Sequence, residues 1–110
     1  MRVISQDGTI DMPYEEVIIQ RFRSRIYFLN KNLTGVESLS DDMQIAEYST
    51  EAKAIKAMEM LREQHEKVAF LKTIINTEKG ASFVRGLSKT DFDKMTQNYF
   101  QFPQDDEIEV

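Results

Sequence analysis

Apolar and polar residues alternate in two pairs of short runs over the first thirty positions. The first pair covers residues 2–5 and 10–12, and the Asp7-Gly8 step between them is typical of a type I′ hairpin turn. Pro13 cannot donate to a sheet ladder and should end the second run. The second pair, residues 17–23 and 26–29, is joined at Ser24 and is the more hydrophobic. The pattern therefore predicts two β-hairpins, with the second at the centre of the sheet.

A long amphipathic helix is predicted for residues 50–72, after a short strand at residues 44–48. Ser49, Thr50 and Glu51 supply capping hydroxyls and an acid for the first turn, and neither Gly nor Pro interrupts the segment. Apolar side chains recur three and four positions apart, which gives one stripe along the helix. That stripe consists of Ile55, Met58, Leu61, His65 and Val68. We expect it to lie across one face of the sheet.

The C-terminal third has a weaker pattern. Residues 76–86 form a break, and residues 88–91 resemble a capping box that opens a short helix. Residues 99–102 then alternate like a strand, which Pro103 ends. Phe100 and Phe102 either complete the core or dock on a partner, and the usual burial of Phe favours the core.

These elements predict an α+β fold. We expect an antiparallel sheet of four or five short strands, with the long helix packed on one face and a short C-terminal helix and strand region. One domain should cover residues 1–102, followed by an acidic tail at residues 103–110.

Composition narrows the range of functions. The chain has 110 residues, no cysteine and a single histidine, so disulfides, cysteine nucleophiles and multi-histidine metal sites are excluded. The net charge is −5, and much of it comes from the tail, which makes phosphate neutralisation on duplex nucleic acid an unfavourable role. The sequence contains no signal peptide and no apolar run of roughly 18 residues, so a cytoplasmic protein without a membrane span is expected.

No motif indicates catalysis, a metal or a cofactor. His65, the only imidazole, falls on the predicted helix stripe and is interpreted as a residue at the edge of the core. Asp41 and Asp42 do not match a calcium loop, and neither a phosphate-binding glycine loop nor a nucleophile elbow is present. We therefore expect no enzyme.

Two clusters remain as candidate binding residues. Arg21, Arg23 and Arg25 are two positions apart, which would place them on one face of a continuous strand and suit an anion. A turn at Ser24 would break that face, and a solvated charged surface is the alternative. The second cluster combines an aromatic residue with the acids of the tail, which suits protein docking. Its members are Tyr99, Asp105, Asp106, Glu107 and Glu109.

Three stretches of the chain resemble a group of small, mostly uncharacterised proteins of Firmicutes bacteria and their phages or mobile elements. They are residues 1–15, residues 46–63 and the ending Phe100-Gln101-Phe102-Pro103 with its acids. The resemblance transfers no catalytic residue. It implies an accessory protein of a mobile element, and inhibitors of host defence proteins are one class of such proteins.

The leading functional hypothesis is a non-enzymatic module that binds a protein partner, with a homodimer as one form. The alternative is a small-ligand protein that holds a nucleotide or another anion on an arginine-rich sheet face.

Overall fold

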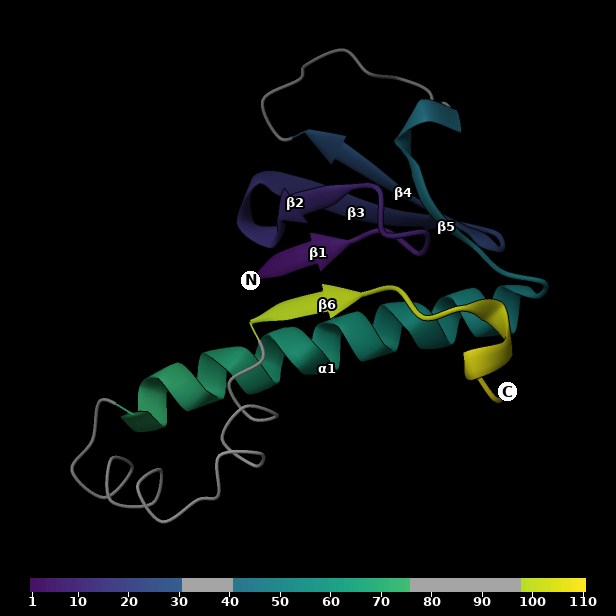
Figure 1. Ribbon diagram of the computed structural model, residues 1–110. Helices are drawn as coiled ribbons and strands as arrows, with labels where there is room; N and C mark the ends of the chain where they lie inside the picture. Colours follow the sequence, from purple (N-terminus) through teal and green to yellow (C-terminus); the bar gives the residue numbers. More distant parts are fainter. Residues whose placement is uncertain (31–40, 76–97) are drawn as a thin grey trace.

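A computed structural model describes residues 1–30, 41–75 and 98–110 (Figure 1). Over these residues the fold is α+β, with two three-stranded sheets and one long helix. The strands are β1 (Arg2–Ile4), β2 (Asp11–Pro13), β3 (Val17–Phe22), β4 (Arg25–Asn30), β5 (Gln44–Glu47) and β6 (Tyr99–Gln101). The helix is α1 (Glu51–Ile75), and the short 3-10 turns are η1 (Tyr14–Glu16), η2 (Asp41–Met43) and η3 (Asp105–Glu107).

The first sheet has the order β2-β1-β6 and joins the two ends of the chain. β1 and β2 form the predicted N-terminal hairpin, and β2 ends at Pro13 as expected. β6 is the predicted C-terminal strand, but it pairs with β1 in the parallel direction. The expected single antiparallel sheet is therefore wrong, because the chain turns through η1 after Pro13 and starts a second sheet.

The turn of the first hairpin also differs from the prediction. A type I′ turn needs positive φ at both central residues, whereas only Gly8 has one, at 78°. The loop is closed by a bond from the Ser5 N–H to the Ile10 carbonyl at 2.8 Å. Inside it, the Asp7 carboxylate accepts hydrogen bonds from the hydroxyls of Ser5 and Thr9, each at 2.7 Å. Bonds from Thr9 and then Ser5 lower the pKa of Asp7 to about 2.

The second sheet has the order β3-β4-β5. β3 and β4 form the predicted second hairpin, but among the described strands only β4 is central and β3 lies at the edge. The two-residue turn between them has a positive φ of 55° at Arg23, as the primed turns of two-residue hairpins require at their first position.

Helix α1 confirms the predicted helix and begins after Thr50, whose hydroxyl caps it by accepting from the Lys53 N–H at 3.2 Å. The core-facing stripe is rotated from the predicted one. Leu61 and Val68 are buried as expected, but Ile55 is 40% exposed. The other buried helix residues are Ala54, Ala57 and Leu71. The small alanines near the N-terminus of α1 let the helix backbone pack close to the sheets. Residue size, rather than hydrophobicity, therefore decides which side of α1 faces the core.

In Figure 1, α1 runs beneath both sheets and lies alongside β6. The core is formed between these layers, and Val3, Ile26 and Phe102 are fully buried in it. Phe100 and Phe102 are both buried and meet edge to face at 5.1 Å between ring centroids, which confirms that they belong to the core. The C-terminal turns of α1 extend past the sheets.

Two expectations cannot be compared with the structure. The short helix opened by residues 88–91 and the break at residues 76–86 lie outside the described residues. Within the described part, no helix is both long and apolar enough to cross a bilayer.

Candidate protein-interaction surfaces

The three arginines do not form one basic face. The register pairs Arg21 with Ile26 and Phe22 with Arg25, so Arg21 shares the inner face of the sheet and Arg25 the outer face. Arg23 lies in the turn, because the hairpin closes at Arg23 and Ser24.

Arg21 and Arg25 also form ion pairs with acids of this chain. Arg21 Nη1 donates to the Glu51 carboxylate at 2.9 Å, across to the start of α1. Arg25 Nε lies 3.5 Å from the Glu47 carboxylate on β5. Arg23 instead places its guanidinium 5.4 Å from the ring centroid of Phe22. The single arginine face that anion binding would require is therefore absent from this hairpin, and the anion hypothesis gains no support.

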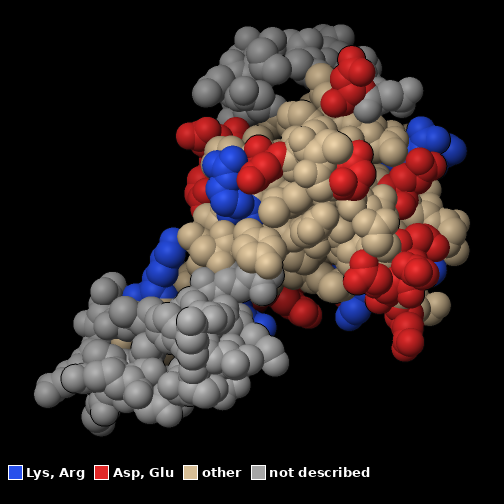
Figure 2. Space-filling model, in the orientation of Figure 1, with Lys and Arg blue, Asp and Glu red and all other residues tan. Residues whose placement is uncertain are grey.

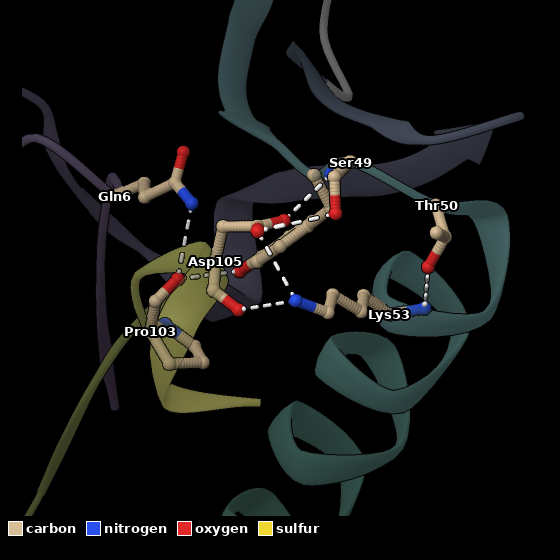
Figure 3. A network of polar contacts seen from close by, with 7 residues as sticks. Gln6, Ser49, Thr50, Lys53, Pro103 and Asp105 are labelled. Carbon is tan, nitrogen blue, oxygen red and sulfur yellow. Dashed lines mark hydrogen bonds and ion pairs between the residues drawn. The ribbon is translucent and has the colours of Figure 1, made fainter. Parts of the chain in front are cut away.

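The C-terminal segment is folded against the body of the protein rather than extended (Figure 3). The Pro103 carbonyl accepts hydrogen bonds from the Tyr48 hydroxyl at 2.8 Å and from the Gln6 amide at 3.1 Å. Ile108 is only 4% exposed and belongs to the core. The sequence predicts that the domain ends at residue 102, before an acidic tail, but buried apolar contacts continue to Ile108.

Asp105 is the anchor of this segment. Its carboxylate accepts from the Ser49 N–H at 2.6 Å and the Ser49 hydroxyl at 3.1 Å, just before α1 begins. The Lys53 ammonium donates to the Asp105 carboxylate at 3.1 Å and to its carbonyl at 2.9 Å (Figure 3). The Ser49 N–H, and then Lys53, lower the pKa of the Asp105 carboxyl. An acid at this end of the helix is also favoured by the helix dipole.

A reciprocal capping box fixes the turn η3 that follows. Gln104 and Glu107 are three residues apart, and the Glu107 carboxylate accepts from the Gln104 N–H at 2.9 Å. Tyr48 lies beneath this turn, and its burial, together with the charges of Asp105 and Glu107, raises the pKa of its hydroxyl. The phenol therefore stays protonated and remains a donor to Pro103.

The candidate partner-binding residues differ in how the fold uses them. Asp105 and Glu107 accept hydrogen bonds within the fold, and the side chains of Asp106, Glu107 and Glu109 are exposed. Figure 2 shows acidic side chains gathered on the right of the molecule, where the C-terminal segment lies. Tyr99 is half exposed on β6, away from that end. Tyr99 and Glu107 nevertheless line one common groove, whereas Asp106 and Glu109 are not part of its lining.

A groove of about 630 Å³ runs between β6 and α1. Tyr99, Gln101 and Pro103 form one wall, and Met60, Gln64 and Lys67 form part of the other. Two of the candidate docking residues, Tyr99 and Glu107, therefore lie on this concave surface.

A second groove, of about 550 Å³, runs between β3 and the opposite flank of α1. His65 lies in it, and its ring packs on Tyr14 with 4.5 Å between centroids. This position at the edge of the core agrees with the interpretation from the sequence. The groove ends at β3, whose outer face carries the most exposed large apolar residues of the sheets, Ile18 at 48% and Phe22 at 53%. The sequence analysis missed this surface because it assigned β3 to the sheet centre.

No group of three or more potential metal ligands occurs among residues 1–30, 41–75 and 98–110. Comparisons with protein-family models, with curated proteins and with solved structures return no match. Function has to be inferred from the geometry described above.

Proposed function

We propose that the chain is a non-enzymatic protein-interaction module that binds its partner through strand β3. The observation that carries this proposal is the exposure of Ile18 and Phe22 on the outer face of an edge strand. Residues four apart in a strand share a face, so the two side chains lie on one exposed face, with Gln20 between them. With Arg23 beside the Phe22 ring, this surface combines aromatic and arginine side chains, the residue types that are enriched in interface hot spots.

The titratable groups support a non-enzymatic role. The described groups with a shifted pKa are Asp7, Glu15, Tyr48 and Asp105. The pKa shift of Asp7 follows from hydrogen bonds in its turn, and that of Glu15 from the Met1 ammonium. The pKa of Tyr48 is raised first by its burial, and that of Asp105 is lowered by its bonds to Ser49 and Lys53. Shifted groups at a catalytic site would instead converge on one cavity.

The resemblance to small proteins of Firmicutes phages and mobile elements supports a more specific role. We infer an accessory protein that inhibits a host defence protein by binding it. The chain would be expressed in a host that carries a defence system, and phage plaques would be counted with and without it. Restored plaquing is expected from the parent and not from an Ile18→Ser/Phe22→Ser variant.

The binding proposal itself is tested by comparing three immobilised proteins. Both the parent chain and the Ile18→Ser/Phe22→Ser variant are used to capture proteins from the host, and captured proteins are then purified and rebound. Phe70→Ser is the matched control, because Phe70 is 64% exposed on the far turns of α1. A partner that rebinds the parent and Phe70→Ser but not the double variant is expected. A partner that binds all three alike would contradict the proposal.

A further inference from the structure

Strand β3 has one edge that no described strand covers. Phe22 and Arg25 flank the two-residue turn, which makes them a hydrogen-bonded pair, and such pairs alternate with non-bonded pairs along the hairpin. Ile18 and Gln20 are therefore bonded to β4. The residues whose backbone N–H and C=O groups point to the open edge are Val17, Ile19 and Arg21. Unpaired edge groups of this kind accept an additional strand.

Helix α1 lines the other side of the groove at β3 with side chains that the core covers only in part or not at all. Met58, Arg62 and His65 lie on the flank of α1 that lines the groove, and Ile55 extends the same flank by one turn. Met58 and His65 are half-buried, and Ile55 is exposed. The apolar surface of α1 is thus wider than its contact with the core.

The groove between these two elements has the size and polarity of a peptide site. Its volume is about 550 Å³, and Val17, Ile19 and Met58 are among its apolar lining residues. It contains two charged side chains, Glu15 and Arg62. The Met1 ammonium neutralises Glu15 at 3.0 Å, whereas Arg62 has no ion-pair partner in the described part of the chain. The excess charge in the groove is therefore positive, which favours a carboxylate in the occupant.

We propose that this groove binds an extended segment of a partner protein as a strand added to β3. The segment carries apolar side chains at alternate positions and an Asp or Glu opposite Arg62. A second copy of this chain is a poorer occupant. An occupant of this groove pairs with β3 along one edge and faces α1 along the other, so neither of its edges can carry a further strand. The β3 strand of a second copy is already paired with its own β4 and lies beside its own α1. The inference rests on the proposed function, for which it names the chemistry of the partner.

The test begins with random octapeptides displayed on a carrier and selected on the full chain. We expect selected peptides to alternate apolar residues and to contain Asp or Glu. They are then synthesised with both ends capped, and their affinity is measured. Arg62→Glu should weaken binding of an acidic peptide roughly tenfold or more, a loss typical of a close charge pair. Lys67→Glu, the same charge change on the other flank of α1, should leave the affinity within about twofold, since rim charges contribute little.

Amide hydrogen exchange then tests the strand addition itself. A bound peptide should slow exchange at Ile19 and Arg21 and leave Ile18 and Gln20 unchanged, because β4 already protects the latter two. Protection at β6, or protection without this alternation, would overturn the proposal. So would a library that yields no binder, or a peptide-free dimer that protects the same edge.

The two proposals fail in distinguishable ways. If the library yields nothing while capture still depends on Phe22, the interaction module stands and this occupant is wrong. If capture does not depend on Phe22, the module proposal itself fails.

Discussion

Replacing Ile108 by alanine should destabilise the whole protein. Its side chain is 4% exposed and belongs to the core cluster, although only two residues follow it in the chain. The change removes the three carbons beyond Cβ, each worth about 0.8 kcal/mol of apolar burial, or about 2.4 kcal/mol together. A residual cavity adds to this cost, but a segment near the chain end can partly collapse into it, so we expect about 2–3 kcal/mol.

The assay is urea unfolding followed by far-ultraviolet circular dichroism, with the thermal midpoint as a second measurement. A domain of this size is expected to be stable by about 5–15 kcal/mol, so the loss would be large. The thermal midpoint should fall by about 8 °C or more, at roughly 4 °C per kcal/mol. Val110→Ala is the control, because Val110 is 73% exposed and should change stability by less than about 0.5 kcal/mol. Equal stability of Ile108→Ala and the control would refute the packing of the C-terminal segment.

Three further predictions concern the packing of α1, the Asp105 contacts of the C-terminal segment and the cap of α1. Ala57→Asp should unfold the protein, because it buries a charge, whereas Ile55→Asp on the exposed flank should melt close to the parent in thermal unfolding. Asp105→Asn should lower the thermal midpoint at neutral pH, with Asp106→Asn as the control that does not. Because the pKa of Asp105 is lowered in the folded protein, its stabilisation is present above the unfolded pKa and is lost as pH falls, so parent and Asp105→Asn should converge in acid. Thr50→Ala removes the helix cap and should cost about 0.5–2 kcal/mol in urea unfolding; an unchanged value would show that the cap is not used.

Local sequence patterns were sufficient to predict most of the individual helices and strands. Both hairpins, the strand before α1 and α1 itself could be predicted, because turn residues, alternation and caps act over a few neighbouring positions. The burial of Phe100 and Phe102 could be predicted as well, from their size and alternation.

The errors concern how the elements pack. The rotation of α1 depends on how closely Ala54 and Ala57 approach the sheets, and hydrophobic periodicity alone favours the larger Ile55. The parallel pairing of β6 with β1 joins residues almost a chain length apart, and no local pattern encodes it.

For the candidate surfaces too, local features could be predicted from the sequence and long-range contacts could not. The separation of Arg21 from Arg25 follows from the turn at Ser24, an alternative that the sequence already offered. The anchoring of Asp105 on Ser49 and Lys53 could not be predicted, since it is a contact between distant segments. One local signal was available, because the spacing of Gln104 and Glu107 is that of a capping box and indicates an ordered turn.

The affinity of the purified partner for three forms of this chain tests the central claim most directly. Titration calorimetry would compare the parent, Ile18→Ser/Phe22→Ser and Phe70→Ser at one salt concentration. Loss of an aromatic hot spot costs about 2 kcal/mol or more, so the double variant should bind roughly thirtyfold more weakly, and Phe70→Ser should equal the parent. Equal affinity of the double variant and the parent would contradict binding through β3.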